Sequence, residues 1–202
     1  MTPRLPPGRT ALLLLDLQRD MMDADGVYAR HGFPVDRLRH VVPVVCRVAE
    51  ASRARGVPIF ASKFTVFTSP SGRPLGLEQL ARTRPFLARE GFRVGDRGRE
   101  LIAGLPTPDY SLDKPRFSAF HGTSLELLLS ALEIRTIVLT GIVSGGAVES
   151  TARDAVLRGL SVVVLEDGLA GLDEDVDARG LVLAGSDVAV MDSASYVRAL
   201  EA

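Results

Sequence analysis

Asp16 and Lys114 are the two side chains whose positions most clearly indicate chemistry. Asp16 follows the apolar run 11–15, so we expect it at the carboxyl end of a buried strand, where open α/β sheets place their sites. An aspartate there can equally well cap a turn. Lys114 is one of only two lysines, with Lys63, among 24 lysine and arginine residues. Its compact ammonium can pair with a carboxylate where a planar guanidinium would not fit, and an ordinary surface lysine is the alternative.

The stretch 139–155 has the pattern of a strand, a tight glycine-rich turn and a helix. The start of a helix presents backbone N–H groups and a positive dipole end, which stabilise an anion or a developing oxyanion. Glycines before a helix are also common where an α/β crossover packs closely. The stretch matches neither the dinucleotide-binding pattern nor the phosphate-binding loop, so it indicates an anion-stabilising turn and no nucleotide cofactor.

Other polar candidates give weaker signals. Cys46, the only cysteine, lies in the largely apolar sequence 44–48, which predicts a buried position on a helix and not a reactive thiol. Ser144 has no histidine nearby in the sequence to activate its hydroxyl. Asp167 follows a predicted strand, and we expect it to cap a helix or turn.

The composition is that of a globular protein that acts on small molecules or proteins. The 202 residues suit a single domain over residues 1–202. A net charge of −1, with basic residues spread along the chain, argues against a nucleic-acid partner. No apolar run approaches the ~18 residues of a membrane span, and residues 1–9 do not resemble a signal peptide. With a single cysteine and no disulfide, we expect a cytoplasmic protein without a membrane partner.

Apolar runs alternate with helical patterns, which predicts βαβ units and a parallel sheet covered on both faces. The expected strands are 11–15, 57–61, 110–112, 136–139, 161–165 and 188–191, and the expected helices are 35–55, 124–132, 148–158, 176–185 and 194–200. The segment 65–99 is rich in Pro, Gly, Arg and Ser. We expect it to form a covering loop with one short helix near 77–81.

Three motifs together resemble the isochorismatase-like hydrolase superfamily. The sequence LLDLQRD at 14–20 is similar to its opening motif, KPRFSAF at 114–120 to its lysine motif, and 140–155 to its nucleophile turn. Their order and spacing also agree with the family. Each motif alone is a weak signal, but the three in this order are specific.

This resemblance implies both a fold and a site. The family fold is a three-layer α/β/α domain with a six-stranded, mainly parallel sheet whose first and fourth strands are neighbours. Asp16 and the turn at Ala147 would then face one crevice. The resemblance also implies a cis peptide bond between Ile142 and Val143, backbone amides of Val143 and Ala147 directed into the crevice, and a homodimer or larger homo-oligomer.

Ala147 is where this sequence departs from the family. In the cysteine-dependent members, an aspartate matching Asp16 takes the proton of a cysteine thiol, a lysine matching Lys114 supports the charge, and the cysteine attacks an amide carbonyl. Ala147 stands at the position of that cysteine, and a methyl group cannot attack a carbonyl. We therefore expect no covalent cysteine route.

Three interpretations remain open. In the first, the protein hydrolyses a small molecule without a cysteine nucleophile, with Asp16 as general acid or base together with Lys114. The branch of the family named for isochorismate uses the aspartate as an acid, which requires a protonated Asp16 near the lysine. In the second, Ala147 is an engineered replacement in an amide hydrolase. In the third, the crevice binds a small molecule without turnover or uses Ser144.

The expected partner is a small-molecule substrate, and no cofactor is expected. Lys63 and Arg73 follow the second predicted strand, and as cations near the crevice we expect them to bind substrate carboxylates. The full set of expected substrate contacts is Gln18, Lys63, Arg73, Phe120 and Ser144. Nicotinamidases, which belong to the same superfamily, carry an Asp and His cluster after the second strand. Residues 61–74 contain no histidine or acidic residue, so we expect no metal.

Overall fold

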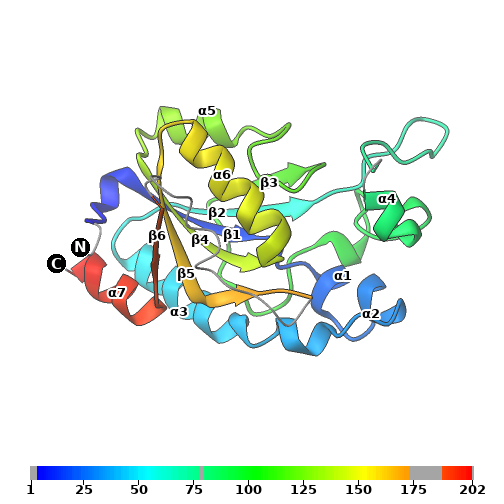
Figure 1. Cartoon of the computed structure of the whole chain (residues 1–202), viewed down its shortest axis with the longest axis horizontal. Coiled ribbons are helices and arrows are strands. Elements are labelled where there is room, and N and C mark those ends of the chain that lie inside the picture. Colours follow the sequence, from blue (N-terminus) through cyan, green and yellow to red (C-terminus); the bar gives the residue numbers. More distant parts are fainter. Residues whose placement is uncertain (1–3, 78–79, 173–187, 202) are drawn as a thin grey trace.

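The computed structural model describes residues 4–77, 80–172 and 188–201, and a six-stranded sheet lies at its centre (Figure 1). From one edge to the other the strands are β3 (Tyr110–Lys114), β2 (Ile59–Phe64), β1 (Thr10–Leu15), β4 (Thr136–Ile142), β5 (Ser161–Ala170) and β6 (Val188–Met191). Every neighbouring pair is parallel. The predicted fold class, with the first and fourth strands side by side, is confirmed.

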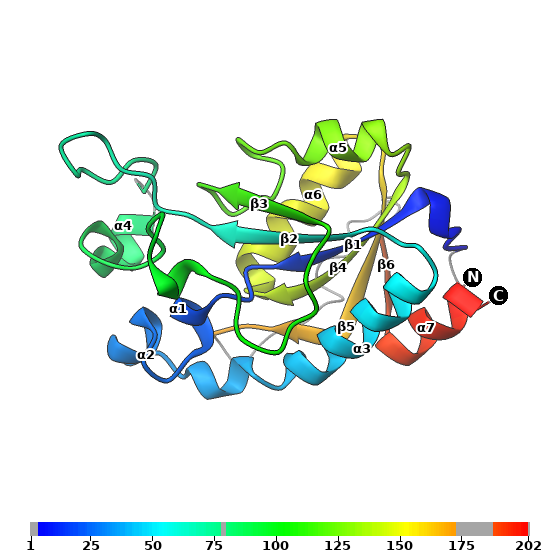
Figure 2. The same cartoon turned by 180° about the vertical axis from the view of Figure 1, so that it is seen from behind.

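Helices cover both faces of this sheet (Figures 1 and 2). The helices α5 (Leu125–Ala131) and α6 (Glu149–Leu157) lie on one face, and α3 (Val41–Ala54) and α7 (Ser193–Glu201) lie on the other. Alternate residues of β1 divide between the two layers. Leu12 and Leu14 pack in the core that includes α3 and α7, whereas Leu13 and Leu15 pack in the core that includes α5 and α6.

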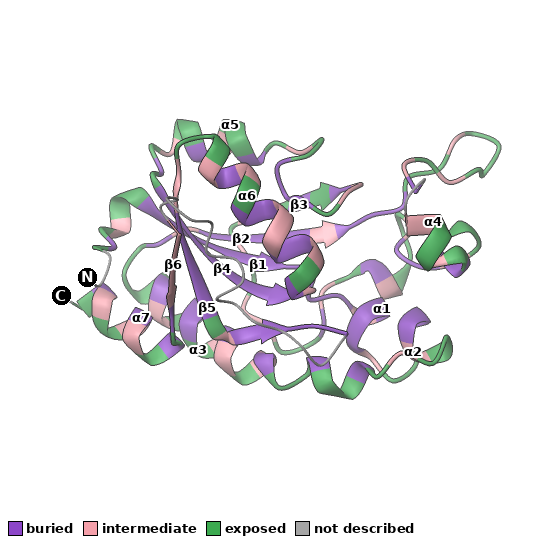
Figure 3. Cartoon of the chain, in the orientation of Figure 1, coloured by how far each residue is buried: buried purple, intermediate pink, exposed green. Residues whose placement is uncertain are grey.

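All six residues of β1 are buried, and Figure 3 shows the same burial along most of the central strands. Because both faces of the sheet are covered, no position of β1 meets water, and the strand is a nearly continuous apolar run. This is the pattern that made the strand recognisable in the sequence.

The predicted helix 35–55 is divided in two. A 3₁₀ turn covers Val35–Leu38, and α3 begins only at Val41. Pro43 lies in the first turn of α3. In a continuous helix its ring would clash with the carbonyl of residue 39, and it has no N–H to donate. The prediction of one uninterrupted helix was therefore wrong at its N-terminal end.

The remaining boundaries differ from the predictions by a few residues. The strand β2 begins at Ile59, two residues later than predicted, and β4 and β5 both extend further toward their carboxyl ends. The strand β6 lies where it was expected. The predicted helix 176–185 lies outside the described residues.

Short helices gather near the carboxyl ends of the strands (Figure 2). They are α1 (Arg19–Met22), α2 (Val27–Arg30), α4 (Leu80–Thr83) and the 3₁₀ turns Pro85–Ala88 and Arg97–Arg99; a further 3₁₀ turn, Pro7–Arg9, precedes β1. The helix α4 provides the short helix expected in the segment 65–99. The buried carboxylate of Asp20 accepts hydrogen bonds from the amides of Val27 (3.3 Å) and Phe92 (2.8 Å), and so joins α2 to this segment.

Two predictions on single residues have different outcomes. Asp167 caps α7 as expected, because its carboxylate accepts a hydrogen bond from the Ser193 amide at 2.8 Å. Cys46 was expected to be buried but is only half-buried, and its thiol donates to the carbonyl of Gly104 at 3.4 Å. Burial nevertheless raises the pKa of this thiol, which argues against a reactive thiolate. None of the described helices is long and apolar enough to cross a membrane.

Candidate active site

A cavity of about 270 Å³ lies at the carboxyl ends of β1, β2 and β3. Its described lining residues are Asp16, Met21, Tyr28, Phe64, Leu80, Thr83, Arg84, Lys114, Phe117, the turn 143–147, Gly171 and Leu172. Apolar side chains and glycines make up most of this lining. The volume is just below the usual range of about 300–1,000 Å³ for small-molecule sites, so the cavity suits a small ligand.

The order of the strands explains why the cavity lies here. From β1 the chain continues to β2 on one side, and from β4 it continues to β5 on the other side. The space between β1 and β4 is therefore the topological switch point, where parallel sheets bind ligands. Asp16 follows β1, and the turn 143–147 follows β4. The sheet therefore brings together two motifs that are more than a hundred residues apart in the sequence.

Asp16 has a left-handed backbone conformation with φ of 54°, which aspartate tolerates better than most residues. Its carbonyl accepts a hydrogen bond from the Gln18 amide at 2.7 Å, so the chain reverses sharply after β1. The buried carboxylate accepts from the Ser62 hydroxyl at 2.6 Å and from the Lys114 ammonium at 2.7 Å. Each oxygen of the Asp16 side chain thus accepts a hydrogen bond from a different donor.

Lys114 is only 1% exposed, which is rare for a lysine and requires that its charge be paired. Besides Asp16, its ammonium donates to the carbonyls of Arg116 and Phe117, both at 2.9 Å. An ammonium has three donors, so these three acceptors use all of them. Lys114 therefore holds Asp16 and the loop after β3 in fixed positions.

The turn after β4 forms the remaining wall of the site. Residues Ser144–Val148 form a π-helical turn that leads directly into α6, and the Ile142–Val143 peptide bond is cis. The carbonyl of Val143 accepts hydrogen bonds from the amides of Gly146 and Val148. Ala147 and Ser144 are both buried, at 2% and 7% exposure, and both line the cavity.

Gln18 was expected to contact substrate, but the structure places its side chain outside the cavity. The amide nitrogen donates to the carbonyls of Phe64 (2.9 Å) and Arg99 (2.7 Å), and its oxygen accepts from the Phe64 amide (2.8 Å). The residue is fully buried. Gln18 therefore ties the chain after Asp16 to the end of β2, a structural role.

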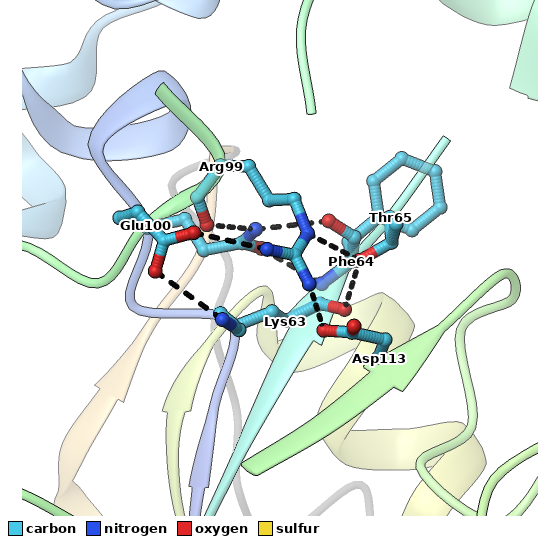
Figure 4. A network of polar contacts seen from close by, with 7 residues as sticks. Lys63, Phe64, Thr65, Arg99, Glu100 and Asp113 are labelled. Atoms are coloured by element: carbon cyan, nitrogen blue, oxygen red, sulfur yellow. Dashed lines mark hydrogen bonds and ion pairs between the residues drawn. The ribbon is translucent and has the colours of Figure 1, made fainter. Parts of the chain in front are cut away.

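Lys63 is also outside the cavity lining. As Figure 4 shows, its ammonium points to Glu100, at 3.2 Å, in a polar network that also contains Arg99 and Asp113. Side chains alternate along a strand, so Lys63 points to the opposite face of β2 from its neighbours Ser62 and Phe64. Ser62 bonds Asp16, and Phe64 lines the cavity. A cation engaged with a carboxylate in this way is not directed at a ligand in the cavity.

Two further expected contacts lie elsewhere. Arg73 is exposed and lies in the segment between β2 and α4, and it is not among the described residues that line the cavity. Phe120 is buried in the core beside α5, with the guanidinium of Arg158 over its ring at 4.7 Å. The phenylalanine of this motif that lines the cavity is Phe117, whose side chain is 43% exposed. The spacing of the motif did not indicate which of the two faces the site.

Tyr28 and Arg84 line the cavity and were missed in the sequence. Tyr28 is 6% exposed, and burial raises the pKa of its hydroxyl, while the Arg84 guanidinium close to that hydroxyl acts in the opposite direction. Tyr28 lies in α2 and Arg84 directly follows α4, and neither short helix has a strong periodic pattern in the sequence. The only signal for Arg84 was its place in a segment expected to cover the site.

Metal and cofactor binding receive no support from the part of the chain that is described. Within it, no group of three or more His, Cys, Asp or Glu side chains is arranged to hold a metal ion. The turn 143–147 has neither the sequence nor the lysine of a phosphate-binding loop. The expectation of no metal and no cofactor stays a prediction.

These features define an α/β protein with an aspartate–lysine pair in a small cavity at the switch point of its sheet. The chain belongs to the isochorismatase family, because the family's sequence model, described as the isochorismatase domain, matches residues 10–195. The predicted membership of the isochorismatase-like hydrolase superfamily is thereby confirmed.

Known relatives agree with this assignment. The chain is 33% identical over 173 residues to the ureidoacrylate amidohydrolase RutB of Pantoea ananatis, which covers 80% of this chain and 69% of that protein. It resembles the crystal structure of N-carbamoylsarcosine amidase from Thermoplasma acidophilum with a TM-score of 0.73 and 26% identity, over 92% of this chain and 96% of that one.

A cysteine hydrolase from Pseudomonas syringae pv. phaseolicola has the same fold, with a TM-score of 0.84 at 23% identity, over 98% of this chain and 95% of that one. The relatives named here are hydrolases. The chain is therefore a member of a hydrolase superfamily. Unlike the cysteine-dependent members, it has Ala147 and not a cysteine in the turn following β4.

Proposed function

We propose that the protein hydrolyses an amide-type carbon–nitrogen bond of a small molecule by direct attack of water, with Asp16 as the general base. The observation that carries the proposal is that the carboxyl group of Asp16 and the methyl group of Ala147 line one cavity. Asp16 can accept a proton there, and Ala147 supplies no nucleophile. The names of two relatives, an amidohydrolase and an amidase, support the choice of bond.

Asp16 is suited to act on water. A carboxylate has about four acceptor positions, and Ser62 and Lys114 occupy two of them, so positions remain for a water molecule. The two donors fix the orientation of the carboxylate before the substrate arrives. General base catalysis by a positioned side chain contributes about 10²–10⁴-fold.

The reaction has two steps. In the first, the water oxygen bonds to the substrate carbonyl carbon, a water proton moves to Asp16, and the carbonyl oxygen becomes an oxyanion. In the second, the carbon–nitrogen bond breaks, the carbonyl re-forms, and Asp16 returns its proton to the leaving nitrogen. The products are an acid and an amine or ammonia. Lys114 stays protonated and keeps Asp16 in place.

The backbone amides of Val143 and Ala147 are the proposed donors to the oxyanion. Both residues line the cavity. The turn is held by the hydrogen bonds of Gly146 and Val148 to the Val143 carbonyl, so its amides are preorganised. Donors that are fixed before the reaction stabilise a developing oxyanion most effectively.

The acid mechanism, in which Asp16 would protonate the substrate, fits the geometry less well. It needs a protonated Asp16, because the carboxyl group must donate a proton to the substrate carbon. Both oxygens of Asp16 instead accept hydrogen bonds, one of them from an ammonium at 2.7 Å. A general base needs a carboxylate that accepts protons, and these two hydrogen bonds are compatible with that role.

Incubation with a panel of small amides and ureido compounds, including ureidoacrylate and N-carbamoylsarcosine, tests the proposal through release of amine or ammonia. We expect turnover by the unmodified protein. Isochorismate serves as the vinyl ether control and should not be cleaved. Isochorismate cleavage without any amide hydrolysis would overturn the proposal in favour of the acid mechanism.

Binding without turnover is the second candidate function, and the methyl group of Ala147 in place of a nucleophile favours it. Ala147→Cys distinguishes the candidates. If the native protein only binds and the variant gains amide hydrolysis, the cavity has the geometry of a cysteine hydrolase whose nucleophile is absent. Turnover by the native protein supports water attack directly.

A further inference from the structure

Arg84 brings a positive charge to the lining of the cavity. Its guanidinium lies over the ring of Phe33 at 4.5 Å, and one of its nitrogens donates to the Thr83 carbonyl at 2.9 Å. Its backbone amide donates to the Leu80 carbonyl at 2.7 Å, which continues the end of α4. Among the described residues, no Asp or Glu forms an ion pair with Arg84.

The other charges of the cavity cancel. Among the described lining residues, the charged ones are Asp16, Lys114 and Arg84. Asp16 and Lys114 form an ion pair at 2.7 Å, and the ammonium has no donor to spare. The described cavity therefore carries one net positive charge, at Arg84. A cation in a cavity whose lining also includes apolar side chains such as Phe64 and Leu172 is best satisfied when a ligand brings the opposite charge.

Tyr28 completes this end of the cavity. Its ring is buried in an aromatic cluster, 5.4 Å from Phe86 and 4.9 Å from Phe33, so the hydroxyl is held in position. The Arg84 guanidinium lies close to this hydroxyl. The pKa of the hydroxyl is raised mainly by burial, so it keeps its proton at neutral pH and can donate it in a hydrogen bond to a ligand.

We propose that Arg84 and Tyr28 form a carboxylate-binding subsite, so that the cavity selects small monocarboxylates. The guanidinium edge matches the two oxygens of a carboxylate, and the phenolic O–H adds a further donor. The other described side chains of the lining, such as Met21, Phe64 and Leu172, are largely apolar and suit a hydrocarbon part of the ligand. Selection of substrates by this subsite rests on the proposed function. The test of the subsite measures ligand binding alone.

The experiment compares flat acids with their alcohols by isothermal titration calorimetry on the full chain. The probes are benzoate against benzyl alcohol and crotonate against crotyl alcohol, none of which has an amide bond to be hydrolysed. We expect each acid to bind at least tenfold more tightly than its alcohol. Arg84→Gln should reduce that ratio to less than twofold, and Tyr28→Phe should reduce it in part.

Arg82→Gln is the matched control, because Arg82 is exposed on α4, two residues before Arg84, and is not among the residues that line the cavity. This variant should keep the full preference for the acids. Equal binding of acids and alcohols, or a preference that survives Arg84→Gln, overturns the inference. Tighter binding of methylphosphonate or inorganic phosphate than of either acid would also overturn the assignment to a carboxylate.

The outcomes also separate this inference from the proposed function. A preference for acids that depends on Arg84, without hydrolysis of any amide, supports the subsite and rejects the hydrolase. Hydrolysis that is indifferent to Arg84 does the reverse.

Discussion

Replacing Lys114 with methionine tests the most buried charge of the site. The side chain of Met has a similar length, but it removes the ammonium that pairs with Asp16 at 2.7 Å and also donates to two carbonyls at 2.9 Å. Asp16 then keeps only the Ser62 hydroxyl as a donor. Removing one partner of a buried ion pair costs about 3–5 kcal/mol, because the other charge is left buried and unpaired.

The assay is equilibrium unfolding in urea at neutral pH, with the midpoint and slope measured separately. We expect Lys114→Met to lower the free energy of unfolding by about 3–5 kcal/mol. Lys63→Met is the matched control. Its ion-pair partner Glu100 is 53% exposed, so losing this pair should cost no more than about 1 kcal/mol.

A double variant sharpens the result. Adding Asp16→Asn to Lys114→Met removes the unpaired charge, so the double variant should be more stable than Lys114→Met alone. The reasoning is refuted if Lys114→Met and Lys63→Met cost the same. It also fails if Asp16→Asn makes the Lys114→Met protein less stable still.

Three further predictions concern residues around the core and the site. Burial raises the pKa of Tyr196 to about 12, above its ordinary value near 10, so unfolding by urea should show stability intact below pH 10 and then falling by about 2–3 kcal/mol as the pH rises to 12; Tyr196→Phe should abolish this loss. Gly141→Ala should lower stability by more than about 2 kcal/mol in the same assay, because φ is 123° and a Cβ would collide with the Leu15 carbonyl; an unchanged midpoint would contradict this. Cys46 should react with iodoacetamide at pH 7.5 more slowly than free cysteine, because burial raises the pKa of its thiol, and an equal rate would count against it.

The fold was predictable because its strands carry strong patterns. An apolar run such as β1 is buried on both faces of a parallel sheet, and this pattern is independent of distant residues. The positions of Asp16 and Lys114 followed from the same logic, since each ends a strand. The pairing of these two residues in one cavity is a consequence of the strand order.

The substrate contacts could not be predicted in the same way. Gln18 and Phe120 belong to recognisable motifs, but which side of the chain they face depends on tertiary contacts: Gln18 binds the backbone of β2, and Phe120 packs beside α5. Arg84 reaches the cavity only because the segment 65–99 folds over the strand ends. No local periodicity indicates that path, so sequence position alone pointed to Lys63 and Arg73 as the substrate-binding cations.

The sharpest test of the account compares kcat/KM of the native protein and Asp16→Asn on the best amide of the panel, with benzoate affinity measured in parallel. A positioned base predicts a loss of about 10²–10⁴-fold with benzoate affinity preserved. If Asp16→Asn hydrolyses the amide at the native rate, the proton acceptor lies elsewhere and the central claim is wrong.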